Sequence, residues 1–262
     1  MLLQDKVAVI YGAGGAIGGA VARAFTREGA TLFLTGRHRE PVEVVGKEIA
    51  AAGGSAHVAE VDALDEKAVD NHLRSVTDKA GRLDISFNAV GIPNPKTRAP
   101  LVELDLEQFS LPIATYTRSY FLTARMAARR MMANRSGVIM TITSTPSRTG
   151  TPFIGGGGAA MAALEALTRG LSAELAPQGI RVVGLRPQGM PETDRIKQAF
   201  ESYAAASGMT WSHFEELLAS RTHTRRLSTL EEMANMAVFL ASDMASGMTG
   251  TTVNLSMGSL DD

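Results

Sequence analysis

The sequence predicts an α/β fold in which a predominantly parallel sheet is covered by helices on both faces. Short apolar, β-branched runs alternate with longer helical patterns along nearly the whole chain. This alternation is typical of parallel strands whose crossover connections are helices. The 262 residues, 45% of them hydrophobic, suit one domain over residues 1–262 that can bury a substantial core.

The first element is a strand, Val7–Ile10, followed by a glycine-rich turn and a helix over residues 17–28. A turn without side chains at a helix N-terminus lets backbone N–H groups reach a pyrophosphate. The stretch therefore predicts a dinucleotide site, with a ligand-free glycine turn as the alternative. The positions expected to contact the coenzyme are Gly12, Gly15, Ala16, Ile17 and Gly18.

The second strand, residues 31–35, ends before Gly36 and Arg37. An acidic residue at this point would favour the ribose 2′-hydroxyl of NAD, whereas a guanidinium can pair with a 2′-phosphate. Arg37 therefore favours NADP(H) over NAD(H). The alternative is a basic turn that only contacts solvent.

The rest of the chain continues the alternation. The other strands are expected at residues 56–61, 83–88, 137–143, 180–185 and 250–255. The other helices are expected at residues 41–53, 65–80, 105–134, 159–176, 193–206, 212–220 and from the 228–231 cap to 242. Asp105 with Gln108 and Ser228 with Glu231 have the spacing of helix caps, and Pro112 predicts a kink or restart.

Composition excludes several classes of function. A net charge of −1 gives no reason to expect nucleic acid or an anionic membrane as partner. There is no cysteine, and the five histidines are scattered, so we expect neither disulfides nor a metal site. The N-terminus lacks the pattern of a signal peptide, which predicts a cytoplasmic protein.

Four motifs resemble those of short-chain dehydrogenases/reductases: Gly12-x-x-x-Ala16-x-Gly18, Asp84 with Asn88-Ala89-Val90-Gly91, the Arg186-Pro187-Gln188-Gly189 turn with Thr193, and the stretch of sequence from Gly157 to Leu175. The resemblance covers essentially the whole chain. It implies a Rossmann-type, doubly wound sheet of seven strands, a nicotinamide coenzyme, a substrate lid at about residues 190–227 and a homodimer or homotetramer. It also implies coenzyme contacts from Asp62, Asn88, Ala89, Gly91, Pro187 and Gly189.

The catalytic positions that the resemblance implies depart from the family pattern. Ser144 matches the serine that orients the substrate oxygen, but the tyrosine position holds Gly157 and the lysine position holds Met161. The position of the family's asparagine falls on Tyr116. Tyr116 is either a substitute proton donor or a residue that packs in the core. The Ser144 hydroxyl forms a hydrogen bond either with the substrate oxygen or with the backbone at the end of the strand. Lys96, Arg98 and Arg148 are either contacts for an anionic substrate or solvated charges.

Three functions remain open at this point. The first is an NADP(H)-binding oxidoreductase of a carbonyl or alcohol substrate with a non-standard proton source. The second is a non-catalytic dinucleotide-binding subunit or sensor. The third is a non-redox isomerase or cyclase on the same fold.

Overall fold

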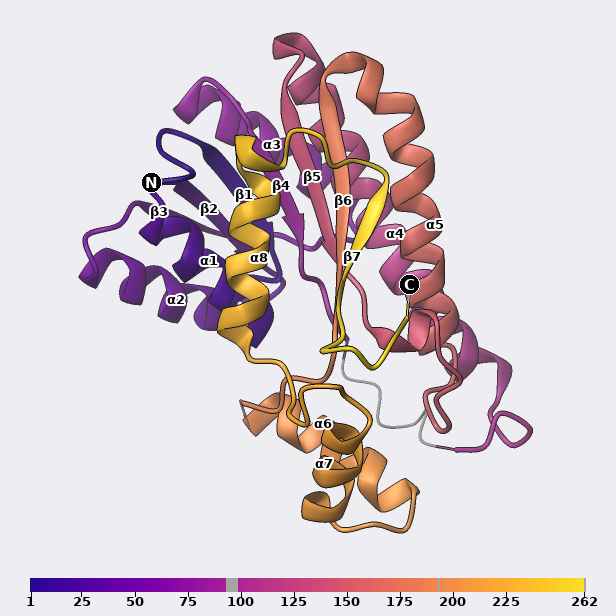
Figure 1. Ribbon diagram of the computed structural model, residues 1–262. Coiled ribbons are helices and arrows are strands. Elements are labelled where there is room, and N and C mark those ends of the chain that lie inside the picture. The colour runs from indigo at the N-terminus through magenta and orange to yellow at the C-terminus, as the bar shows by residue number, and fades with distance from the viewer. Residues whose placement is uncertain (93–98, 193, 262) are drawn as a thin grey trace.

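The structure is a computed structural model that describes residues 1–92, 99–192 and 194–261. In this part of the chain one parallel sheet has the strand order β3-β2-β1-β4-β5-β6-β7 (Figure 1), which confirms the predicted fold class. The strands are β1 Val7–Tyr11, β2 Thr31–Gly36, β3 Ala56–Glu60, β4 Ile85–Asn88, β5 Gly137–Ile142, β6 Ile180–Pro187 and β7 Thr251–Leu255.

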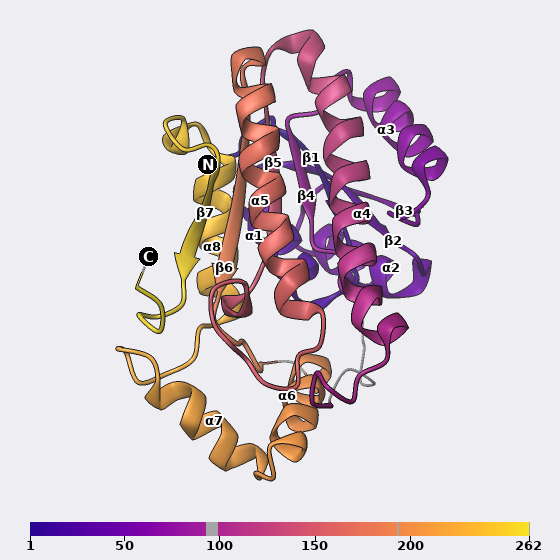
Figure 2. The same cartoon turned by 90° about the vertical axis from the view of Figure 1, so that its right-hand side faces the viewer.

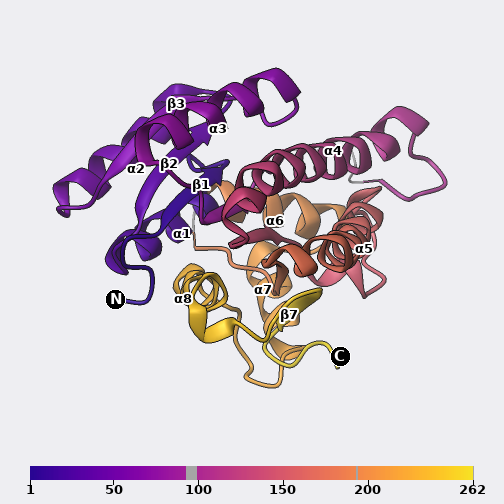
Figure 3. The ribbon, with the colours of Figure 1, turned by 90° about the horizontal axis from the view of Figure 1, so that it is seen from above.

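Helices cover both faces of the sheet (Figure 3). One buried apolar cluster joins the sheet to α1, α2 and α8, and a second joins it to α3, α4 and α5. Figure 2 looks onto α4 and α5, which lie side by side. The helices are α1 Ala16–Arg27, α2 Arg39–Ala51, α3 Glu66–Ala80, α4 Leu106–Met131, α5 Gly157–Leu175, α6 Asp194–Ala206, α7 Trp211–Ser220 and α8 Leu230–Ala241.

The strand order changes direction between β1 and β4, which positions the site. The chain moves outward from β1 to β2 and β3, then returns to the other side of β1 with β4. In sheets with this topology, ligands bind in the crevice outside the carboxyl ends of the strands, at the point where the strand order changes direction. Helices α6 and α7 lie at this same end of the molecule (Figures 1 and 2).

Three local predictions need correction. The cap of α8 lies one residue later than expected: Thr229 and Glu232 form the capping box instead of Ser228 and Glu231. Helix α5 begins at Gly157, two residues earlier than expected.

Pro112 lies inside an uninterrupted α4 and does not divide it. The proline is buried, and its ring packs beneath the backbone of Gly156. The helix thus continues through the proline, although proline cannot donate a backbone hydrogen bond. None of the helices in the described ranges combines the length and apolar character needed to cross a bilayer.

Candidate functional site

The N-terminus of α1 is open toward the crevice. Its N-cap, Gly15, has no side chain that could accept from the first-turn N–H groups, and no acidic residue lies in that turn. The donors of Ala16 and Ile17 therefore have neither a side-chain cap nor a neighbouring carboxylate. A helix end of this kind favours an anionic group because free N–H groups and the helix dipole act together.

Two glycines of this turn are required by close backbone contacts. A Cβ on Gly12 would lie 2.6 Å from the carbonyl oxygen of Ala89, and Gly12 has a φ of +76°. A Cβ on Gly18 would collide with the carbonyl oxygen of Gly12. The turn after β1 is thus pressed against both α1 and the turn after β4, so only glycine fits at these positions.

Two predicted coenzyme residues flank the outer end of the crevice. Arg37 follows β2, is exposed and makes no ion pair with any described residue. Asp62 follows β3, is also exposed, and its carboxylate accepts the Leu64 N–H at 2.9 Å. Both side chains are therefore accessible from the crevice side of the sheet.

Asn88 shapes the turn after β4. Its buried side-chain amide donates to the Thr123 hydroxyl at 3.0 Å, and its carbonyl oxygen accepts the Val90 N–H at 3.1 Å. The bond to Val90 fixes the backbone of Ala89 and Val90, which lies against Gly12 of the glycine turn. Asn88 thus acts on this site through the backbone that it positions.

Ser144 follows β5 at the same end of the sheet. Its hydroxyl makes no hydrogen bond within the described part of the chain. The alternative in which this hydroxyl bonds to the protein backbone is therefore not seen in the described residues. The next residue, Thr145, donates to the side-chain oxygen of Gln188 at 3.3 Å and joins the Ser144 turn to the end of β6.

A buried ionic cluster that the sequence analysis missed anchors the Ser144 turn. Glu165 of α5 is 2% exposed and accepts hydrogen bonds from Thr143, Ser147, Arg148 and Arg186. Arg186 lies on β6 and is 1% exposed. A charged residue in the apolar run of β6 is the sequence signal that could have revealed it, since a buried charge needs a partner.

The first turns of α5 carry no ionisable side chain toward the crevice. Gly157 is the first helical residue, and a Cβ there would meet only the flexible Ile154 side chain at 3.0 Å. Met161 is 9% exposed and belongs to the apolar cluster against which Tyr116 packs. The Tyr116 hydroxyl accepts the Ile92 N–H at 3.5 Å, so it is oriented toward the loop after β4.

The turn after β6 closes the site from the other side. Pro187 is buried, and Gly189 lies against the ring of Phe200 in α6, where a Cβ on the glycine would be 2.6 Å from Cζ. Helix α6 is therefore packed directly on this turn. The predicted residues Thr193, Lys96 and Arg98 lie outside the described residues.

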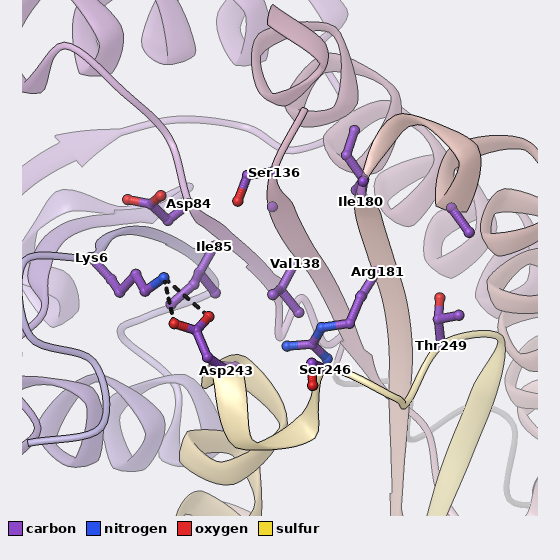
Figure 4. A pocket seen from close by; sticks show the side chains of 14 residues that line it. Lys6, Asp84, Ile85, Ser136, Val138, Ile180, Arg181, Asp243, Ser246 and Thr249 are labelled. Atoms are coloured by element: carbon purple, nitrogen blue, oxygen red, sulfur yellow. Dashed lines mark hydrogen bonds and ion pairs between the residues drawn. The ribbon is translucent and has the colours of Figure 1, made fainter. Parts of the chain in front are cut away.

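A cavity of about 340 Å³ lies at the opposite end of the sheet, between the amino ends of β4, β5 and β6 (Figure 4). Arg181 donates from this cavity to the carbonyl oxygens of Leu240, Ser242 and Met248, and Lys6 pairs with Asp243 at 3.2 Å. Burial lowers the pKa of Arg181 from its ordinary value. These cations neutralise the C-terminal end of α8, so we assign the cavity a structural role.

The described residues contain no group of histidine and carboxylate side chains arranged to hold a metal ion. The open α1 N-terminus, the glycine contacts and the strand order instead fit a dinucleotide. Together they define the class of protein: a doubly wound α/β protein with a dinucleotide-binding crevice.

Comparisons with known proteins identify the family. The family model described as Enoyl-(Acyl carrier protein) reductase matches residues 12–259. The chain is 28% identical to the 7alpha-hydroxysteroid dehydrogenase of Escherichia coli K12 over 267 residues, which covers 99% of this chain and 96% of that protein.

Two solved structures extend the comparison. NAD+-bound xylitol dehydrogenase has a TM-score of 0.93 at 25% identity and covers 98% of this chain and 100% of its own. Gluconate 5-dehydrogenase from Burkholderia cenocepacia, in complex with NADP and tartrate, has a TM-score of 0.86 at 27% identity, with 98% and 95% covered.

This chain belongs to the short-chain dehydrogenase/reductase family. Its relatives are oxidoreductases of small molecules, and the shared fold binds nicotinamide dinucleotides.

Proposed function

We propose that this protein is an NADP(H)-dependent oxidoreductase of a carbonyl or alcohol substrate that transfers protons by a route other than the usual one of its family. The open N-terminus of α1, pressed against the turn after β4, is the observation that carries the proposal. The residues that would hold the coenzyme are Gly12, Gly15, Ala16, Ile17, Gly18, Arg37, Asp62, Asn88, Ala89, Gly91, Pro187 and Gly189.

The preference for NADP(H) rests on Arg37. Its guanidinium is exposed beyond β2 and unpaired among the described residues, so a 2′-phosphate would gain a charge-assisted partner at little cost. Calorimetric titration with NADPH and NADH tests this step. We expect NADPH to bind at least tenfold more tightly, and equal affinities would contradict the proposal.

The proton route is proposed from the residues at the family's catalytic positions. Gly157 and Met161 stand where the family has tyrosine and lysine, and neither can donate a proton or carry a charge. A positioned general acid is worth about 10²–10⁴ in rate. Reduction of a simple ketone should therefore be slow by this margin, while substrate orientation in the crevice remains.

Ser144 and Tyr116 are the side chains we assign to the substrate. A bound nicotinamide supplies or accepts the hydride. The Ser144 hydroxyl, which has no internal partner among the described residues, would donate to the substrate oxygen. Tyr116 would deliver the proton, directly or through water. Loss of NADPH consumption in both Ser144→Ala and Tyr116→Phe would support these roles.

A non-catalytic dinucleotide-binding subunit or sensor is the second candidate. The apolar environment of Met161 favours it, because this side chain fills core space and leaves no charged group at the crevice. Gly157→Tyr combined with Met161→Lys tests it. Under this reading the double variant gains carbonyl reduction that the parent lacks entirely, whereas a measurable parent activity excludes it.

A non-redox isomerase or cyclase would convert substrate with no change in nicotinamide absorbance, which separates it from the first candidate.

We further propose one domain over residues 1–262, with α6 and α7 as a substrate lid within residues 190–227, and association of copies through α4 and α5. Helix α4 exposes Leu106, Leu111 and Phe121, and exposed large apolar side chains often mark interfaces. Sedimentation should then show a dimer or tetramer, and a monomer at micromolar concentration would contradict this.

A further inference from the structure

A single buried carboxylate binds residues on both sides of Ser144. Thr143 precedes Ser144 and donates its hydroxyl to the Oε1 of Glu165 at 3.3 Å, and Ser147 follows Ser144 and donates to the same oxygen. The Ser147 N–H also donates to the Ser144 carbonyl oxygen at 2.9 Å. The turn that carries Ser144 is therefore held on Glu165 as one unit at the carboxyl end of β5.

Arg148 is the last residue of this unit. Its Nε donates to the second oxygen of Glu165, Oε2, at 3.1 Å, and its backbone N–H donates to the Thr145 carbonyl oxygen at 2.9 Å. Its Nη1 and Nη2 make no hydrogen bond with any other described residue. The side chain is 53% exposed, so Glu165 holds one edge of the guanidinium while the terminal amino groups are open to solvent.

The charges of this cluster do not cancel. Glu165 already has a buried counter-ion, because the Nε of Arg186 lies 3.0 Å from its Oε1 and both side chains are at most 3% exposed. One cation is enough to balance one buried carboxylate. Arg148 adds a second positive charge, and within the described ranges it pairs with no acidic side chain other than Glu165. An exposed guanidinium with a surplus charge favours an anion as its further partner.

The surplus charge lies at the ligand-binding end of the sheet. Strand β4 lies between β1 and β5, and all three run parallel, so their carboxyl ends share one edge. Ligands of such sheets bind outside this edge. A 3-10 turn over residues 145–147 separates Ser144 from Arg148, and a rise of about 2 Å per residue puts their Cα atoms within about 8 Å of each other.

We propose that Arg148 forms an anion subsite, and that the substrate is a small carbonyl compound that also carries a carboxylate or a phosphate. The guanidinium would bind a pair of anionic oxygens while the Ser144 hydroxyl binds the carbonyl oxygen. This inference rests on the proposed function, since it names the substrate class of that same site. It makes Arg148 a specificity-determining residue and Glu165 the positioning residue that holds both side chains on one turn.

Two matched pairs of ligands test the subsite by calorimetry on the full-length protein. The pairs are 4-oxopentanoate with its methyl ester, and dihydroxyacetone phosphate with dihydroxyacetone. Each is titrated without coenzyme and with saturating NADP+, which cannot reduce the ketone. We expect at least one anion to bind about tenfold or more tightly than its neutral partner, and the pair that shows this distinguishes carboxylate from phosphate. No preference for the anion in either pair would overturn the inference.

A pair of variants locates the anion. Arg148→Gln should abolish the preference for the anion and leave the affinity of the neutral partner unchanged. Arg169→Gln removes the same charge from the exposed face of α5, where Arg169 pairs with no described residue, and should leave the preference intact. Equal losses in the two variants would overturn the placement. The wild-type titration remains decisive if Arg148→Gln fails to fold.

Coenzyme binding separates the two proposals. NADPH binding, followed by the coenzyme's own fluorescence, reports on the proposed function alone. A preference for the anion without NADPH binding would support the subsite and reject the proposed function. NADPH binding without a preference for the anion would reject the subsite and leave the proposed function standing.

Discussion

Individual residues at the crevice divide into those fixed by backbone geometry and those that can be exchanged. Gly12 and Gly18 admit no side chain because carbonyl oxygens occupy the space. Gly157 differs, because its missing side chain would meet only the movable Ile154. The glycine turn after β1 is thus constrained by the fold, whereas the fold does not require glycine at the first position of α5.

The first prediction follows from this contrast. Gly18→Ala should lower the free energy of unfolding by about 1–3 kcal/mol, because it forces a methyl group against backbone. Gly157→Ala should change it by less than about 1 kcal/mol, since alanine is the better helix former. Urea unfolding of both variants measures the difference, and equal losses would contradict the proposed constraint.

The second prediction concerns Arg37. Arg37→Ala should weaken NADPH binding about 10- to 100-fold by removing charge-assisted hydrogen bonds to the 2′-phosphate, while NADH binding stays nearly constant. Arg39→Ala is the matched control, because Arg39 is also exposed but pairs with Glu43 at 2.6 Å. Calorimetry gives both affinities. A parallel loss for NADH would show that Arg37 acts on something other than the phosphate.

Residues whose positions depend on local sequence could be predicted, and contacts that depend on distant partners could not. The glycines and Arg37 directly follow apolar strands, so their placement at the crevice followed from the strand pattern. Glu165 lies on a helix in an ordinary pattern, and only the fold brings it to Arg186 and Ser147. Its function as an anchor therefore had no local sequence signature.

At the scale of elements, the types and order of helices and strands agree with those predicted from the sequence. The predictions that were wrong concern the ends of helices. Apolar periodicity extends over many residues and is hard to misassign. A helix end depends on one or two side chains, and Ser228-Thr229 with Glu231-Glu232 offers two registers of the same cap. Ser228 is buried and donates to the Leu255 carbonyl, which leaves Thr229 to form the cap.

The third prediction tests this register. Thr229→Ala should lower the free energy of unfolding by about 1 kcal/mol, because it removes the hydroxyl that accepts the Glu232 N–H at 3.1 Å. Glu231→Ala should change it by less than about 0.5 kcal/mol, since this exposed side chain takes no part in the box. Thermal or urea unfolding distinguishes them. A larger loss of unfolding free energy in Glu231→Ala than in Thr229→Ala would instead support a capping box formed by Ser228 and Glu231.

At the scale of the whole molecule, stability should depend on pH through a partly buried histidine. Burial lowers the pKa of His72 to about 4, and its Nε2 has no hydrogen-bond partner within the described structure. The unfolded chain therefore binds a proton between about pH 6.5 and pH 4 that the folded chain does not. The free energy of unfolding should fall as the pH drops through this interval.

The fourth prediction measures this dependence. His72→Phe should reduce the loss of unfolding free energy between pH 7 and pH 5 by up to about 2 kcal/mol. His57→Phe is the control, because His57 also lies beside Phe33 but is exposed. Urea titrations at the two pH values give the comparison. An unchanged loss in His72→Phe would assign the acid sensitivity to other groups.

The central position of β1 has a consequence for synthesis of the chain. Val7–Tyr11 leaves the ribosome before the other six strands of the sheet, yet one of its two neighbours, Ile85–Asn88, emerges much later. Until then the nascent protein holds a fully apolar strand with one bare edge, the kind of segment that aggregates. Chaperone contacts during translation should therefore concentrate on these five residues and end once β4 has been made.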